Sequence, residues 1–314
     1  MFSKALFINF TGTETPPNYF DRLKILFEKI EFISRDDPKL KDSLNDTEVI
    51  FTKFGTSIDK EIIDSAPNLK YIGKLATAYD DIDVKYARSK NITVCNLGGY
   101  STEAVAEFAI AAIFERAREL ERAKNQARKE DFGFADFMGI ELKDKTLGVI
   151  GAGRIGGRIA EMGLGLGMKV NYFSRESKTE IAAKGAIKKE LDEVISESDF
   201  VTIALALTKE TEGIINKDKI SLFKKNAILV NIAPPVLLDQ EAILEKTEKG
   251  ELTFIFDHSD DITPELAKRF LANPNCIVYP PIAFRSKEAD IARLETFTSN
   301  IENFIKGKPQ NVVN

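Results

Sequence analysis

The chain has 314 residues, of which 43% are hydrophobic and 30% charged, as is typical of a globular protein with an ample core. The formal net charge of −5 is spread over interleaved acidic and basic residues, which excludes the dense basic tract of a nucleic-acid groove. No apolar run approaches the roughly 18 residues that a membrane span requires. The length predicts two domains.

The two cysteines indicate a reducing compartment. Cys95 and Cys276 lie inside the apolar runs "ITVCN" and "NCIVY", so we expect both to be buried free thiols. The first ten residues, "MFSKALFINF", are shorter than a signal peptide and are patterned like a strand. We therefore expect a cytoplasmic protein that binds neither nucleic acid nor membrane.

Short apolar runs alternate with amphipathic segments in the first part of the chain. This alternation predicts βαβ units around a parallel sheet. The expected strands are 5–10, 48–54, 69–76 and 91–97, and the expected helices are 18–30, 59–67 and 83–90.

A glycine pair then opens a long stretch, 98–130, that has no further glycine or proline. The hydroxyl-and-acid pattern "STEAVAE" predicts a capped start, and alanine with alternating charge predicts one continuous helix. Such a helix suits a hinge or a dimer surface. A second α/β series follows over 145–284, and the tail 286–307 is predicted as one amphipathic helix.

The second series opens on a glycine-rich loop. "TLGVIGAGRIGGRIAEMG" (146–163) reads as a strand, then Gly151, Gly153 and Gly156, then a helix. In such loops the first glycine permits a tight turn, the second lets the backbone approach a pyrophosphate, and the third allows close helix packing. The helix N-terminus adds partial positive charge and N–H donors. The stretch predicts dinucleotide binding; the alternative is a glycine turn kept for packing or for another nucleotide-like ligand.

The end of the following strand, "KVNYFS" (169–174), bears on the choice of cofactor. An acidic residue there would bind the adenine ribose and repel a 2′-phosphate. This chain instead has Ser174 and Arg175, with Lys178 nearby. A hydroxyl and a guanidinium suit a phosphate, so NADP(H) is favoured over NAD(H). Arg175 and Lys178 as plain solvated loop charges are the alternative.

Taken together, the segments resemble the D-isomer-specific 2-hydroxyacid dehydrogenase family, which includes D-3-phosphoglycerate dehydrogenase and the glyoxylate/hydroxypyruvate reductases. The resemblance covers nearly the whole chain. It rests on 69–111, which is similar to the family's stretch from substrate loop to interdomain helix, on the cofactor loop "GAGRIGGRIA", and on 207–233, 237–252 and 273–289.

The resemblance implies an α/β fold of two doubly wound parallel-sheet domains with a cleft between them. A flavodoxin-like substrate domain would comprise 1–98 plus 286–314, and a Rossmann cofactor domain 99–285. It also implies a homodimer. The implied cofactor contacts are Gly151, Gly153, Arg154, Ile155, Gly156, Ser174, Arg175, Lys178, Ala204, Leu205, Thr211, Ile232, Ala233 and Asp257, and the implied substrate contacts are Ala76, Thr77, Ala78 and Tyr100; no metal site is expected.

The chain departs from the family at its catalytic positions. The family uses a histidine base, a carboxylate that tunes it and an arginine that holds the substrate. Here Pro234 follows "NIA" at the arginine position, and Pro281 in "YPP" stands at the histidine position. After Asp257 come Asp260 and Asp261, with no glutamate before Glu265. Proline neither carries charge nor transfers a proton, and a general base alone is worth about 10²–10⁴ in rate.

Other residues are candidate replacements. Asp257 at a strand end and His258 after it, the only histidine, are two of these candidates; strand alternation would point their side chains in opposite directions. Arg285 is a candidate cation, and Lys74, Tyr100 and Tyr279 are weaker candidates. For each, a structural or solvated role is the alternative. The loop "LATAYD" (75–80) still resembles the family's amide cradle for a substrate carboxylate, although Ala76 and Ala78 replace the commoner glycines.

The substitutions predict an apolar cleft, suited to an apolar or neutral ligand. Three functions remain open: an oxidoreductase that reduces a non-standard substrate with relocated residues, a non-catalytic nucleotide-binding or regulatory homologue, and a cleft adapted to another adenosine-containing ligand and non-redox chemistry. The residues expected to line the cleft are Pro234, Pro235, Pro281, Ile282, Ala283 and Phe284, with Ala204 and Ala206 in place of polar or proline residues.

Overall fold

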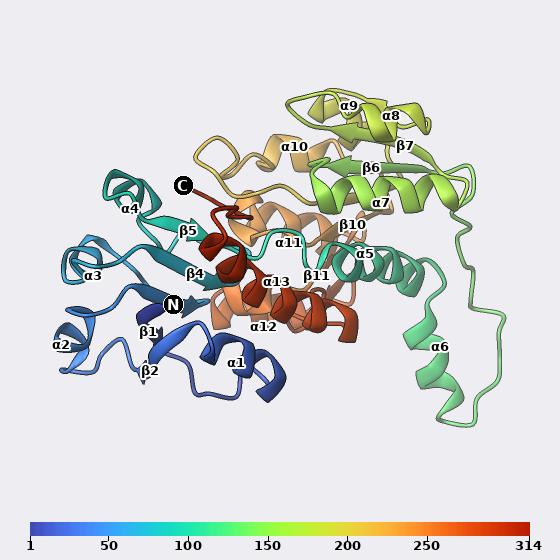
Figure 1. Ribbon diagram of the computed structural model, residues 1–314. Helices are drawn as coiled ribbons and strands as arrows, with labels where there is room; N and C mark the ends of the chain where they lie inside the picture. Colours follow the sequence, from blue (N-terminus) through green and yellow to red (C-terminus); the bar gives the residue numbers. More distant parts are fainter. The chain divides into compact units, whose positions relative to one another are not determined.

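A computed structural model describes residues 1–314, which form two compact α/β units (Figure 1). Unit 1 comprises Met1–Ser101 and Ser286–Asn314, and unit 2 comprises Thr102–Arg285. Both sheets are entirely parallel, with strand orders of the flavodoxin and Rossmann type. The predicted fold class of two doubly wound parallel-sheet domains is thereby confirmed.

Unit 1 has a five-stranded sheet in the order β2-β1-β3-β4-β5. Its strands are β1 (Phe2–Ile8), β2 (Phe27–Ile33), β3 (Val49–Lys53), β4 (Tyr71–Leu75) and β5 (Thr93–Cys95). Its helices are α1 (Pro17–Lys24), α2 (Leu40–Leu44), α3 (Lys60–Asp64), α4 (Val84–Ser89) and the C-terminal α13 (Lys287–Ile305).

The two faces of this sheet carry separate cores, because successive strand residues point to opposite sides. Leu6 and Ile50 face α2, α3 and α4, whereas Phe7 and Phe51 face α1 and α13. Phe297 of α13 lies with its ring centre 5.0 Å from that of Phe51, so the chain's last helix belongs to the core of unit 1.

Unit 2 has a seven-stranded sheet in the order β12-β11-β10-β9-β6-β7-β8. The strands are β6 (Thr146–Ile150), β7 (Lys169–Phe173), β8 (Ile187–Lys188), β9 (Phe200–Ile203), β10 (Ala227–Asn231), β11 (Leu252–Phe256) and β12 (Cys276–Val278). The helices are α5 (Thr102–Ala117), α6 (Leu120–Ala127), α7 (Arg154–Gly165), α8 (Thr179–Ala183), α9 (Leu191–Glu197), α10 (Lys217–Ser221), α11 (Gln240–Glu248) and α12 (Pro264–Ala272), with 3₁₀ turns η1 (Pro235–Leu237) and η2 (Ser259–Asp261).

The strand order of unit 2 reverses between β6 and β9, which are neighbours in the sheet. In open parallel sheets, ligands bind outside the carboxyl ends of the strands at such a reversal. The glycine loop after β6 and the loop after β9 are therefore at the expected ligand-binding edge.

The helix predicted over 18–30 is wrong in its second half. Helix α1 ends at Lys24, and β2 begins at Phe27 and pairs in parallel with β1. No glycine or proline separates the two elements, so the local sequence carries no signal for the change. Pairing with β1, a tertiary interaction, decides it.

The single helix predicted over 98–130 is also wrong, because it starts at Thr102 and breaks after Ala117. Glu119 has a left-handed backbone (φ 48°), and α6 starts at Leu120. The Ala117 carbonyl accepts the N–H of Ile140 (2.8 Å), and the Glu121 N–H goes instead to the side chain of Glu115 (2.7 Å). A distant segment thus takes one of the carbonyls that a continuous helix would need.

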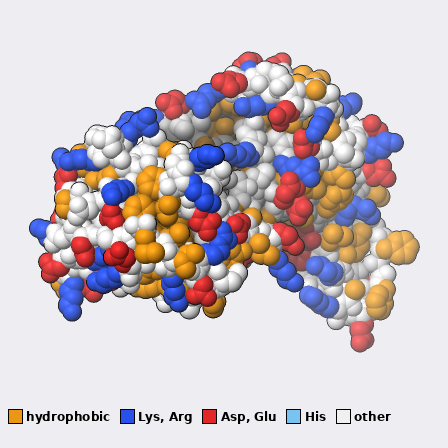
Figure 2. Space-filling view, in the orientation of Figure 1, with side chains coloured by type: hydrophobic (Ala, Val, Ile, Leu, Met, Phe, Trp, Pro, Cys, Tyr) orange, Lys and Arg blue, Asp and Glu red, His pale blue; other side chains and the backbone are white.

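The segment after α6 exposes hydrophobic side chains. Phe132, Phe134 and Met138 are 78%, 85% and 84% exposed, and orange atoms cover this part of unit 2 at the right of Figure 2. Both cysteines are buried free thiols, as predicted. No helix is long and apolar enough to cross a bilayer.

Candidate functional site

The glycine loop after β6 is shaped by two close backbone approaches, at Gly151 and Gly156. Gly151 has a left-handed backbone (φ 97°), and a Cβ there would lie 2.8 Å from the backbone of Ala204. A Cβ on Gly156 would lie only 1.9 Å from the Gly151 carbonyl oxygen. A Cβ on Gly153 would meet nothing within 4 Å, so this glycine borders open space.

The N-terminus of α7 leaves hydrogen-bond donors for a ligand. The first helical hydrogen bond runs from the Gly157 N–H to the Gly153 carbonyl (2.8 Å), and the N–H groups of Arg154, Ile155 and Gly156 bind nothing within the chain. Such donors at a helix start, together with the helix dipole, favour an anion such as a diphosphate.

The loop after β7 carries positive charge and lies within electrostatic reach of Glu210, a residue that the sequence did not single out. Arg175 is exposed, and the Ser174 hydroxyl donates to the Glu176 carbonyl. The pKa of Glu210 is lowered, mainly by its hydrogen bond with Thr208 and to a smaller extent by the positive charge of Arg175. Glu210 sits in the loop after β9, more than thirty residues away in sequence, so only the fold brings it within electrostatic reach of Arg175.

Two residues predicted to contact the cofactor form hydrogen bonds within their own loops. The Thr211 hydroxyl donates to the Ala206 carbonyl (2.8 Å) and accepts the Thr208 N–H (2.8 Å), which closes the loop after β9. The Lys178 N–H donates to the Tyr172 hydroxyl (3.0 Å). The individual cofactor contacts predicted from the sequence stay predictions.

At the end of β10, Pro234 stands in a turn that suits proline. The buried Asn231 amide donates to the Ala233 carbonyl (2.7 Å), and its oxygen accepts the Ala233 N–H (3.3 Å). Pro234 follows with φ −52°, within the range that its ring imposes, and its carbonyl accepts the Leu237 N–H (3.2 Å). The strand therefore ends in a rigid turn with no cation.

Asp257 joins the carboxyl ends of β11 and β12. It is 2% exposed; one carboxylate oxygen lies 2.9 Å from His258 Nδ1, and the other accepts the Ala283 N–H (2.9 Å). The prediction that Asp257 and His258 point apart is wrong, because β11 ends at Phe256 and strand alternation no longer applies.

His258 is held as an oriented imidazole. A carboxylate only accepts hydrogen bonds, so Nδ1 carries the proton and Nε2 is the nitrogen left for a ligand. Burial lowers the pKa of His258, but the hydrogen bond and charge of Asp257, aided by Asp261 and Asp260, outweigh it and raise the pKa above its ordinary value. A carboxylate that orients an imidazole is the arrangement that general acid–base catalysis uses.

The other predicted catalytic side chains are not assembled around this pair. Arg285 is exposed, forms no ion pair and lies 5.9 Å from the centre of the Phe284 ring. Tyr279 packs edge-on against Phe108, with ring centres 5.3 Å apart. Ile282 and Phe284 are 42% and 38% exposed, so the loop around Pro281 presents apolar surface.

In unit 1, the loop after β4 offers backbone donors. Thr77, Ala78 and Tyr79 are exposed, and their N–H groups, like that of Asp80, bind nothing within the chain. Lys74, in contrast, is fully buried, so it is not available to a ligand. Tyr100 packs at the margin of the core that α1 and α13 cover.

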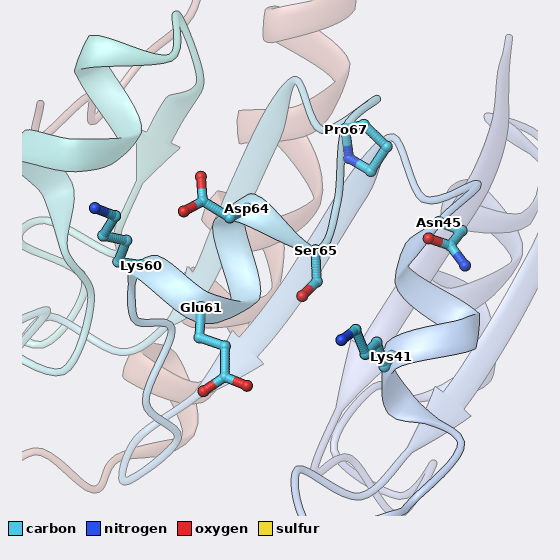
Figure 3. Close-up of a pocket in the computed structure, with 7 residues that line it drawn as sticks. All are labelled: Lys41, Asn45, Lys60, Glu61, Asp64, Ser65 and Pro67. Carbon is cyan, nitrogen blue, oxygen red and sulfur yellow. The ribbon is translucent and has the colours of Figure 1, made fainter.

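Unit 1 also has a hollow away from the loop after β4. It measures about 720 Å³ and is lined by polar side chains of α2, α3 and the residues that follow them (Figure 3). Asn45 and Ser65 there precede β3 and β4, so the hollow borders the amino ends of these strands. It is at the opposite edge of the sheet from the loop after β4.

Comparison with known proteins identifies the family. Residues 110–283 match the NAD binding domain of the D-isomer specific 2-hydroxyacid dehydrogenases. A glyoxylate reductase of Thermococcus kodakarensis is 32% identical over 311 residues, which cover 95% of this chain and 93% of that protein. The chain belongs to the D-isomer specific 2-hydroxyacid dehydrogenase family. Unit 2 accordingly carries the family's NAD-binding domain.

Solved structures with a similar fold cover nearly the whole chain. D-Lactate dehydrogenase of Aquifex aeolicus, complexed with NAD and lactic acid, superimposes with a TM-score of 0.84 at 28% identity and covers 97% of this chain and 96% of its own. The acyclic imino acid reductase Bsp5, complexed with NADPH and D-Arg, gives 0.86 at 27% identity and covers 99% of this chain and 100% of its own. Solved structures similar to this chain thus contain either NAD or NADPH.

We predict that Gly156→Ala destabilises unit 2 by roughly 1–3 kcal/mol, because the new methyl group collides with the Gly151 carbonyl. Gly157→Ala is the matched control: it lies in the same helix, its Cβ would meet nothing within 4 Å, and it should gain up to about 1 kcal/mol. Urea unfolding measures the free energy of unfolding of both variants. Equal effects would show that the contact does not constrain the loop.

We also predict that the His258–Asp257 pair stabilises the fold most at low pH. Because the folded-state pKa of His258 is raised, the stabilisation is fully present below the unfolded-state value of about 6.5 and is lost as the pH rises through the folded value. The chain has one histidine, so an NMR titration of its imidazole is unambiguous. Asp257→Asn should lower the measured pKa; an unchanged value would contradict the pairing.

Proposed function

We propose that this protein is an NADP(H)-dependent reductase of the family that acts without the family's arginine and histidine. The supporting observation is the pair Pro234 and Pro281, which stand at the strand ends where the resemblance places the substrate-holding cation and the base. Neither proline transfers a proton or carries charge. Reduction of an ordinary 2-oxo acid should therefore be slow.

The proposed cofactor follows from the loop after β7. Arg175 and Lys178 offer cations, Ser174 offers a hydroxyl oxygen, and no carboxylate occupies the strand end to repel a 2′-phosphate. Glu210 of the loop after β9 lies within electrostatic reach of Arg175. A bound NADPH would supply the hydride for reduction of a C=O or C=N group.

Unit 1 supplies the proposed carboxylate site. The unpaired N–H groups of Thr77, Ala78 and Tyr79 are the donors that a substrate carboxylate needs, and they do not depend on the missing arginine. In unit 2, the exposed Ile282 and Phe284 give the loop around Pro281 an apolar surface, which favours a ligand with an apolar part.

His258 is the proposed proton donor. Its Nδ1 is fixed by Asp257, and its raised pKa keeps a larger fraction of the imidazole protonated near neutral pH. Protonated His258 carries a positive charge as well as a proton at Nε2, so this residue supplies part of what the absent arginine and histidine provide.

Imine reduction is a second candidate, favoured by the same two prolines. An iminium nitrogen already carries its proton and a positive charge, so hydride addition to the carbon needs neither an acid nor a polarising cation. The fold also matches an acyclic imino acid reductase crystallised with NADPH over nearly its whole length.

The family resemblance also implies a homodimer, and this stays a prediction. The three strongly exposed side chains after α6, Phe132, Phe134 and Met138, are consistent with a surface that a second copy covers.

We predict that Arg175→Ala raises the dissociation constant of NADPH about tenfold or more, because it removes a charge-assisted hydrogen bond to the 2′-phosphate. NADH binding should be unchanged. Arg128→Ala, an exposed arginine just after α6, is the matched control. Nicotinamide fluorescence measures the binding of NADPH and NADH to the wild type and to both variants. Equal losses of affinity for the two cofactors in Arg175→Ala would contradict the 2′-phosphate interpretation.

Turnover tests the function itself. NADPH oxidation is followed with 2-oxo acids, ketones and aldehydes, each with and without ammonium or methylamine. We expect slow reaction with glyoxylate and pyruvate, and faster reaction with substrates that have an apolar part. Activity only with an amine present would select the imine reductase, and rapid reduction of glyoxylate would contradict both candidates.

Binding without turnover would identify a different protein. If NADPH binds but no substrate is reduced, the non-catalytic or regulatory homologue is correct. If only a non-nicotinamide adenine nucleotide binds, the cleft serves another adenosine-containing ligand. The double variant Pro234→Arg with Pro281→His is the internal control, because it restores the cation and the base and should gain activity with glyoxylate.

A further inference from the structure

The loop after β4 is held from behind by the segment that follows β5. The Leu97 N–H donates to the Ala76 carbonyl (3.0 Å), and the Asn96 side-chain amide donates to the Thr77 carbonyl (2.7 Å). The Thr77 hydroxyl returns a hydrogen bond to the Leu97 carbonyl (2.9 Å). Two successive carbonyls of the loop are therefore directed toward Asn96 and Leu97.

This arrangement sets the direction of the loop's N–H groups. A trans peptide is planar, and its C=O and N–H point in opposite directions; the chain has no cis peptide bonds. Since the Ala76 carbonyl faces Leu97, the Thr77 N–H faces away, and since the Thr77 carbonyl faces Asn96, the Ala78 N–H faces away too. Both N–H groups are the unpaired, exposed donors of the proposed carboxylate site.

Asn96 is itself fixed by the C-terminal part of the chain. It is 7% exposed; its carbonyl accepts the Asn300 amide of α13 (2.9 Å), and its N–H donates to the Asn311 carbonyl (3.1 Å). The Asn311 amide donates to the Asn300 side-chain oxygen (2.9 Å). A chain of three asparagines thus connects the C-terminal residues to the loop.

The far end of the loop has a second anchor. The fully buried Lys74 ammonium donates to the Lys53 carbonyl (2.8 Å) and pairs with Asp81 (2.5 Å). Burial lowers the pKa of Lys74, and the hydrogen bond and charge of Asp81 oppose that effect. The pair compensates the charge of Asp81, and the charge of Asp80 also acts on Lys74.

We propose that Asn96 is a positioning residue for substrate: it turns the Thr77–Ala78 peptide so that successive backbone N–H groups face a substrate carboxylate. The proposal rests on the proposed function, in which this loop receives the carboxylate. Asn96 touches neither substrate nor cofactor and acts through the loop backbone.

The test is Asn96→Ala in the full-length protein, with oxamate as the carboxylate probe in the presence of saturating NADPH. The dissociation constant of oxamate should rise about tenfold, the order of one hydrogen bond, while that of NADPH changes less than twofold. Amide hydrogen exchange at Leu97 should accelerate, because Thr77, the residue after its acceptor Ala76, loses its hydrogen bond to the Asn96 side chain.

Asn273→Ala is the matched control. Asn273 of unit 2 is also 7% exposed and donates a comparable hydrogen bond, to the Thr247 hydroxyl (2.8 Å), so it should lower stability without moving oxamate affinity or Leu97 exchange. Thr77→Val is a milder second variant at an exposed position; it removes the bond to Leu97 and should shift both readouts in the same direction.

The outcomes separate this inference from the proposed function. Unchanged oxamate affinity and unchanged Leu97 exchange in Asn96→Ala would overturn the positioning role. If the wild-type protein binds no oxamate but Leu97 exchange still accelerates in the variant, Asn96 positions the loop and the proposed carboxylate site is wrong.

Discussion

Parallel strand pairing is the constraint on which the rest of the molecule depends. Every pairing in both sheets is parallel, so each connection has to cross back along the sheet before the next strand can begin. All strands of a sheet then end at the same edge. The glycine loop, the turn at Pro234, the Asp257 carboxylate and the loop around Pro281 are far apart in sequence but share one edge of the sheet in unit 2.

Both prolines are compatible with the way that edge is built. At Pro234 the backbone already has a φ that proline imposes, and the Asn231 amide holds the turn just before it. Around Pro281 the loop is held by the hydrogen bond from the Ala283 N–H to the buried Asp257. In the proposed function, these rigid apolar side chains stand in place of charged, proton-transferring ones, and His258, which the same carboxylate orients, is the proposed proton donor.

In the proposed function, backbone groups take on more of the ligand recognition because the arginine and histidine of the family are absent. The N–H donors at the start of α7 and in the loop after β4 do not depend on side-chain identity, which is why Ala76 and Ala78 can stand where glycines are commoner. Their direction does depend on support from elsewhere: a close helix contact at Gly156 in one case, and the asparagines behind Thr77 in the other.

The order of apolar runs and the spacing of Gly151, Gly153 and Gly156 determined the fold class and the place of the dinucleotide loop. Such patterns are local, and each reports the geometry of its own strand, turn or helix. The start of β2 at Phe27, the helix break at Glu119 and the pairing of Asp257 with His258 were decided only by the tertiary structure. In each case the deciding contact comes from an element distant in sequence, or from the end of a strand that the local pattern does not mark.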